Sequence, residues 1–151
     1  MTRREMRDHC FKMLFGVGFY PAEETAVQAE QYFCSPVEED TAEDGTVEIL
    51  HQVDIKEPDR TFLTGRVEAM AEKASELDER LNAVAQGWRT RRMGRVELAI
   101  LRQALYEMLY DSEVPEKVAI NEAVELAKKY GGKDSPAFIN GILAKVVESY
   151  V

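Results

Sequence analysis

The chain has 151 residues, of which 45% are hydrophobic and few are glycine or proline, and it carries a formal net charge of −9. This composition argues against a disordered chain and predicts one folded domain with its own core. No run of residues is long enough to span a membrane, and the apolar segment 10–20 lacks the pattern of an export signal. We therefore expect a cytoplasmic protein in which Cys10 and Cys34 are reduced and buried.

The negative charge is concentrated in one part of the chain. Residues 21–59 hold 12 acidic side chains and a single base, Lys56, so the remainder has 18 bases, 16 acids and a net charge of +2. A negative net charge alone would argue against nucleic-acid binding, because Lys and Arg supply most of that affinity by neutralising phosphates. The uneven distribution leaves RNA binding open.

A first helix is predicted from about Arg3 to Phe15, because Thr2 and Glu5 have the spacing of a reciprocal capping box. Its apolar face contains Met6, Cys10, Met13, Leu14 and Val17. A neighbouring strip mixes arginines with aromatic rings, namely Arg3, Arg4, Arg7, Phe11 and Phe15. Single-stranded RNA is bound by such a mixture, since guanidinium groups contact phosphates and aromatic rings stack on bases. The alternative is an ordinary solvated helix face.

The next part of the chain is acidic. Residues 22–33 predict a short helix with Ala26, Ala29 and Phe33 facing inward. We expect the acidic segment at about 36–58 to be a flexible connection with at least one helical turn, and we interpret its charge as solvated; a binding role is the alternative. His9 and His51 each stand alone, so we predict no metal site.

Two amphipathic helices are predicted after Asp59, the second beginning after Ser75. Their apolar positions are Phe62, Leu63, Val67, Met70, Ala74, Leu77, Leu81, Val84 and Trp88. The densest basic cluster follows, formed by Arg89, Arg91, Arg92 and Arg95. These arginines either contact an RNA backbone or pair with nearby carboxylates, and the sequence does not decide between the two. Arg95–Asp111 is the most apolar helix, and we expect it at the centre of the core.

The last two helices are separated by a glycine hinge. Pro115 is suited to open the first of them, and we expect it to end at Gly131 and Gly132 through a left-handed residue. Asp134 or Ser135 is predicted to cap the second, with Pro136 in its first turn. The corner formed by Lys133, Asp134 and Ser135 therefore lies beside a helix N-terminus, which favours an anion. Simple capping is the alternative.

No catalytic constellation is evident in the sequence. It contains no glycine-rich phosphate loop, and no Ser or Cys has a plausible His partner. The carboxylates of Glu97, Glu107, Glu122 and Glu125 are interpreted as surface charge. We therefore predict a protein that is not an enzyme and needs no cofactor.

Two long stretches resemble the family of the bacterial transcription antitermination factor NusB. They are RMGRVELAILRQALYEMLY (residues 92–110) and VAINEAVELAKKYGGKDSPAFINGIL (residues 118–143). The resemblance implies an all-α fold of about seven helices in two small bundles, packed as one domain over residues 1–151. It also implies a non-catalytic adaptor that binds boxA RNA of nascent ribosomal RNA transcripts, together with the small-subunit ribosomal protein NusE, and supports processive transcription by RNA polymerase.

By matching motifs, the resemblance also implies which residues act. The RNA-binding residues would be Arg3, Arg4, Arg7, Lys12, Phe15, Lys133, Asp134, Ser135, Phe138 and Asn140, and Glu97 would face the protein partner. Where the family has Gln-x-Leu-Tyr in the first helix, this chain has Lys12-Met13-Leu14-Phe15, which loses an amide and a hydroxyl that could read bases. We expect the amino-terminal arginines and the 133–135 corner to form one positive pocket.

The alternative function is a self-associating helical module whose homodimer masks the RNA surface, because sequence does not report whether the chain is a monomer or a homodimer. A domain of this kind also occurs fused to a ribosomal RNA cytosine methyltransferase. That arrangement requires a cofactor-binding domain, which we do not expect in this chain.

Overall fold

The computed structural model describes residues 1–17, 22–34, 38–41, 43–51, 55–85 and 89–149. Within them the chain forms seven α-helices, as predicted. These are α1 (Arg3–Val17), α2 (Thr25–Phe33), α3 (Asp59–Glu72), α4 (Ala74–Val84), α5 (Arg95–Tyr110), α6 (Glu116–Tyr130) and α7 (Ser135–Glu148), with 3-10 turns η1 (Ala22–Glu24) and η2 (Thr90–Arg92). None of the described helices is long and apolar enough to cross a bilayer.

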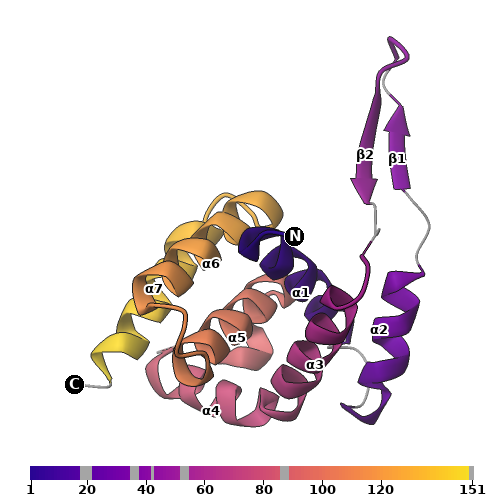
Figure 1. The fold of residues 1–151 in the computed structure, drawn as a ribbon. Coiled ribbons are helices and arrows are strands. Elements are labelled where there is room, and N and C mark those ends of the chain that lie inside the picture. The colour runs from indigo at the N-terminus through magenta and orange to yellow at the C-terminus, as the bar shows by residue number, and fades with distance from the viewer. Residues whose placement is uncertain (18–21, 35–37, 42, 52–54, 86–88, 150–151) are drawn as a thin grey trace.

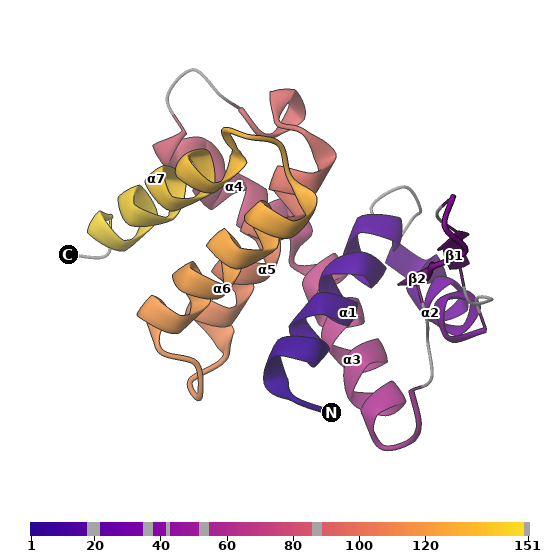
Figure 2. The same ribbon diagram turned by 90° about the horizontal axis from the view of Figure 1, so that it is seen from above.

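The helices form two bundles with separate cores (Figures 1 and 2). The first core lies among α1, α2 and α3 and includes Cys10, Phe33 and Leu63. The second lies among α4, α5, α6 and α7 and includes Leu105 and Ile139. Helix α1 serves both, because its Phe11 is only 3% exposed and packs into the second core. Burial of one aromatic ring across the boundary therefore ties the two bundles together.

The acidic segment contains a β-hairpin, so the predicted helical turn is wrong. Strand β1 (Glu38–Thr41) pairs antiparallel with β2 (Val47–His51), with Thr41 opposite Val47, and the hairpin projects from the helical body (Figure 1). The turn is made by Asp44, which accepts a hydrogen bond from the Thr46 backbone N–H at 2.9 Å, and by Gly45 at φ 86°. Asp-Gly is a strong hairpin signal, because glycine adopts positive φ without steric cost.

Several predicted burials also need correction. Cys10 is buried as expected, but Cys34 is exposed. In α2 the inward residue of the first turn is Thr25, whereas Ala26 is exposed. Phe62, predicted as a core residue of α3, is 46% exposed. The predicted core position of Trp88 lies outside the described residues.

The glycine hinge between α6 and α7 works by close approach. Gly131 has φ −93°, so the predicted left-handed exit is wrong. A Cβ atom at Gly131 would lie 2.6 Å from the Ser135 Cβ and 2.8 Å from the Ala127 carbonyl oxygen. Real Cβ atoms do not approach other atoms so closely, so the hinge requires glycine at this position because the start of α7 packs directly against the end of α6.

Candidate nucleic-acid interface

The capping box predicted for α1 is present. The Glu5 backbone N–H donates to Thr2 Oγ1 at 3.1 Å, and the Thr2 backbone N–H donates to Glu5 Oε2 at 3.4 Å. This reciprocal pair satisfies two backbone donors that lack intrahelical partners. It fixes where α1 begins and therefore which way the arginines at its start point.

Helix α1 lies along α6, and polar contacts join the two. Arg4 donates from Nε and Nη2 to the two carboxylate oxygens of Glu122, at 3.1 and 2.9 Å. One turn further along, Asp8 Oδ1 accepts from the Tyr130 hydroxyl at 2.6 Å and from Lys129 Nζ at 3.0 Å. Burial acts to raise the pKa of Asp8, but the hydrogen bonds from Tyr130 and Lys129 outweigh it and lower that pKa. Asp8 therefore stays charged within this seam.

Arg7 is committed to an internal ion pair. Its Nε lies 2.9 and 3.0 Å from the two oxygens of Glu107, and the side chains are 12% and 5% exposed. Glu107, interpreted from the sequence as surface charge, is therefore buried. Burial raises the pKa of Glu107, and Arg7 offsets only part of that effect. The role that the structure gives Arg7 is to compensate this buried charge, which differs from the RNA contact predicted for it.

The predicted aromatic strip is only partly accessible. Phe11 is buried against Tyr130, with ring centroids 4.9 Å apart, so it cannot stack on a base. Phe15, one turn later, is half-buried. Lys12 lies beside them, with Nζ 3.3 Å from Asp8 and 5.9 Å from the centre of the Tyr130 ring. Lys12 and Phe15 are thus the accessible residues at the carboxyl end of α1.

The 133–135 corner is built around a buried serine. Ser135 is 6% exposed, and its Oγ donates to Glu97 Oε1 at 2.5 Å and accepts from the Gly132 backbone N–H at 3.0 Å. Neither Asp134 nor Ser135 makes a side-chain capping bond to α7, so the predicted cap is wrong. Glu97 was predicted to face a protein partner, yet its carboxylate reaches back to this corner and joins the start of α5 to the start of α7.

The remaining corner residues differ in exposure. Lys133, Asp134 and Asn140 are exposed, and no ion pair joins Lys133 to a carboxylate in the described part of the chain. Phe138 is half-buried and packs against the second core. The corner therefore offers one cation and two other polar side chains to a ligand, with Ser135 and Phe138 supporting them from below.

A basic cleft lies next to the corner, which the sequence did not predict. It has a volume of about 290 Å³ and is lined by Phe15, Thr90, Arg91, Arg95 and Arg102, among others. Arg102 is held by Asp78 through two hydrogen bonds of 2.7 and 2.6 Å. Arg91 is exposed and forms no ion pair with a described carboxylate. Because Glu97 and Ser135 join α5 to the corner, Phe15, Arg91, Arg95 and Lys133 lie at one end of the molecule, which we call the basic end.

The single pocket expected from the sequence is not what the structure forms. Arg3 lines a different cavity, between the start of α1, helix α3 and the end of α5. Arg3 and Phe15 are twelve residues apart on one helix, which is about 18 Å along its axis. The amino-terminal arginines and the basic end therefore occupy opposite ends of α1. Within the described residues, no group of His, Cys, Asp and Glu side chains is placed to hold a metal ion.

The chain has clear relatives along nearly its whole length. The model of the NusB family matches residues 4–148. Transcription antitermination protein NusB of Lachnoclostridium phytofermentans is 45% identical over 148 residues, which cover 98% of this chain and 100% of the relative. The protein of the same name from Agathobacter rectalis is 41% identical, with 96% and 98% covered.

Solved structures show the same fold. T. maritima NusB superposes with a TM-score of 0.77 at 26% identity, covering 98% of this chain and 92% of that one. A structure of the antitermination factors NusB and NusE in complex with dsRNA contains a chain that matches with a TM-score of 0.70 at 20% identity, covering 98% and 97%. The sequence matches and the shared arrangement of helices agree, and the chain belongs to the NusB family.

Proposed function

We propose that the chain is a non-catalytic transcription antitermination factor of the cytoplasm, which holds boxA RNA of nascent ribosomal RNA transcripts jointly with the ribosomal protein NusE and thereby supports RNA polymerase. Family membership supports this assignment, since the relatives are named transcription antitermination proteins. A relative of the same fold is in complex with NusE and RNA. The sequence contains no catalytic constellation that would suggest a reaction instead.

The basic end is the observation that carries the proposal. In a chain of net charge −9, it gathers Arg91, Arg95 and Lys133 around the half-buried ring of Phe15. Cations beside an aromatic ring suit single-stranded RNA, because the cations contact phosphates while the ring stacks on a base. The acidic hairpin lies away from this end, on the side of α2 and α3 (Figure 1).

The residues divide into contacts and supports. The accessible side chains at the basic end, Lys12, Phe15, Lys133 and Asn140, are assigned to RNA, and Asp134 borders them. Arg3 and Arg4 extend the RNA contact along α1, because Arg4 remains 73% exposed even while paired with Glu122. Arg7, Ser135 and Phe138 act from beneath by holding α1 and α7 in place. Glu97 remains the residue assigned to NusE.

The test is a titration of boxA RNA with and without NusE, against a scrambled RNA of equal length. We expect weak binding by the chain alone and much tighter binding with NusE. Lys133→Ala should lower affinity for all RNAs and reduce the slope of log affinity against log salt by about 1. Lys128→Ala is the matched control, because Lys128 is an equally charged side chain that faces solvent on α6 and pairs with Glu125 at 3.2 Å. Equal effects of the two substitutions would contradict the proposed surface.

The same titration addresses self-association. We propose that the two bundles act as one domain, since Phe11 belongs to the core of the second while α1 builds the first. Molecular mass measured in solution, with and without RNA, distinguishes a monomeric adaptor from a homodimer. A dimer that excludes RNA and never dissociates on its addition would favour the alternative function.

A further inference from the structure

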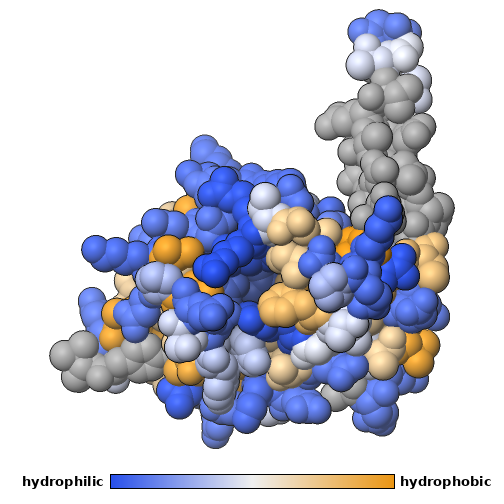
Figure 3. All heavy atoms as spheres, in the orientation of Figure 1, coloured by the Kyte–Doolittle hydropathy of each residue, from blue (hydrophilic) through white to orange (hydrophobic). Residues whose placement is uncertain are grey.

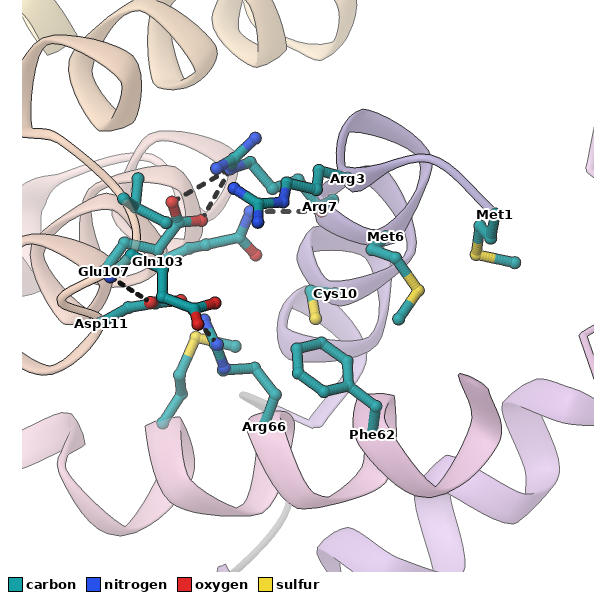
Figure 4. A pocket seen from close by; sticks show the side chains of 13 residues that line it. Met1, Arg3, Met6, Arg7, Cys10, Phe62, Arg66, Gln103, Glu107 and Asp111 are labelled. Carbon is teal, nitrogen blue, oxygen red and sulfur yellow. Dashed lines mark hydrogen bonds and ion pairs between the residues drawn. The ribbon is translucent and has the colours of Figure 1, made fainter. Parts of the chain in front are cut away.

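A second candidate site lies at the opposite end of α1 from the basic end. It is a cavity of about 320 Å³ between the start of α1, helix α3 and the end of α5. Met1, Met6, Cys10 and Phe62 line its apolar side (Figure 4). In Figure 3, apolar atoms near the amino terminus border a hollow whose other side is strongly hydrophilic. Thioether and aromatic walls of this kind adapt to flat apolar groups.

The inner side of this cavity holds an unsatisfied hydrogen-bond acceptor. Gln103 is 3% exposed, and its Nε2 donates to the Arg7 carbonyl oxygen at 3.2 Å. Its Oε1 is the one buried side-chain oxygen or nitrogen of the described residues that has no partner, and Figure 4 shows the amide beside the open part of the pocket. A buried carbonyl without a donor is costly, so the site favours a ligand that brings an N–H group.

The cavity wall is also built for a flat ring. Phe62 is 46% exposed, and the Arg66 guanidinium lies 5.1 Å from the centre of its ring. Arg66 is held there by Asp111 at 2.8 Å, so the ring and the guanidinium form a supported platform. Arg3 stands at the edge of the cavity with its charge exposed. Carboxylates face the site too, but Glu107 and Asp111 are each paired with an arginine, which leaves Glu113 as the acid that is exposed.

We propose that this cavity receives one base of the bound RNA strand, with the base stacked on Phe62, its exocyclic amino group donating to Gln103 Oε1, and its phosphate beside Arg3. Adenine and cytosine carry such an amino group, so the pocket selects one of these two. The inference rests on the proposed RNA-binding function and extends it. A strand held at the basic end and passing along α1 reaches this pocket about 18 Å further on.

The experiment combines protein and RNA changes in one cycle. Each nucleotide of the boxA RNA is replaced in turn by an abasic residue, and affinity is measured for the unaltered chain with NusE and for Phe62→Ala. We expect Phe62→Ala to weaken binding fivefold or more, as loss of one base stack does. At a single adenine or cytosine, the abasic replacement should weaken binding to the unaltered chain but have no further effect on Phe62→Ala. Removing only the amino group at that position should also weaken binding.

Controls keep the outcomes apart. Phe62→Tyr retains the ring and should bind as the unaltered chain does, and Val27→Ala removes another exposed apolar side chain, 58% exposed on α2, and should have no effect. If Lys133→Ala weakens binding but Phe62→Ala does not, the base pocket is wrong while the proposed function stands. If Phe62→Ala weakens binding of NusE in the absence of RNA, the cavity is a protein site and the proposal is overturned. Absence of RNA binding by the unaltered chain overturns both.

Discussion

Replacing Arg7 by alanine should destabilise the fold, although the sequence alone assigns Arg7 to RNA. The substitution leaves Glu107, whose side chain is 5% exposed, without the guanidinium 2.9 Å away. Removing one partner of a buried ion pair costs about 3 to 5 kcal/mol, and we take the lower end because Arg7 retains some contact with solvent. A loss of about 3 kcal/mol corresponds to a fall in melting temperature of roughly 6 to 12 °C for a chain of this size.

Urea unfolding followed by circular dichroism measures this change. Arg4→Ala is the matched control, since Arg4 lies on the same helix and pairs with Glu122 while 73% exposed, and an exposed pair adds little to stability. We expect its midpoint to equal that of the unaltered chain. Equal midpoints for Arg7→Ala and Arg4→Ala would refute the buried-pair reasoning. If the expected difference is found, weaker RNA binding by Arg7→Ala cannot be interpreted as a lost contact.

The pH dependence of stability follows from the same pair. Burial raises the pKa of Glu107 in the folded chain, so the folded state binds its proton more tightly than the unfolded state does. Its contribution to the free energy of unfolding is therefore present below the unfolded pKa and lost as pH rises through the folded pKa. Without Arg7 the folded pKa rises further, so the deficit of Arg7→Ala should be smaller at acidic pH than at neutral pH. A deficit that does not change with pH would contradict the assignment.

Three further predictions concern the hinge and the thiols. Gly131→Ala should lower the free energy of unfolding by about 1 to 3 kcal/mol through overpacking, whereas Gly132→Ala should not, since its nearest neighbour would be 4.0 Å away; equal effects would exclude close approach as the cause. Ser135→Ala should cost about 1.5 kcal/mol by the same measurement, because it removes a buried hydrogen bond to a carboxylate, and an unchanged midpoint would count against that bond. A thiol reagent should modify one cysteine of the folded chain, Cys34, because burial protects Cys10 and raises its pKa to about 12. Rapid modification of two thiols would show that Cys10 is accessible.

Local pattern was sufficient for the helices and for part of the interface. Apolar spacing predicted the helical segments, and the Thr2–Glu5 box predicted the start of α1. The exposed Lys133 and Asn140 lie where the resemblance implied. The hairpin was missed because the Asp44-Gly45 signal stands within acidic residues that conceal the short strands.

Partners distant in sequence were not predictable. Glu107 is identical in local context to a surface acid, and only the packing of α1 across α5, a hundred residues apart, makes it the partner of Arg7. In the same way Glu97 and Ser135 are 38 residues apart, and nothing near either of them indicates that they share a hydrogen bond. Gly131 was predicted for a reason of backbone conformation, whereas the structure gives a reason of packing.

The sequence by itself determined the number and kind of helices, the location of the negative charge and the family, because these depend on the order of neighbouring residues. Tertiary structure alone decided which arginines face solvent, which carboxylates are buried, and that the two ends of α1 carry separate sites. Charge exposure is set by which helices pack together, and helix packing brings together side chains whose separation along the chain carries no local signal.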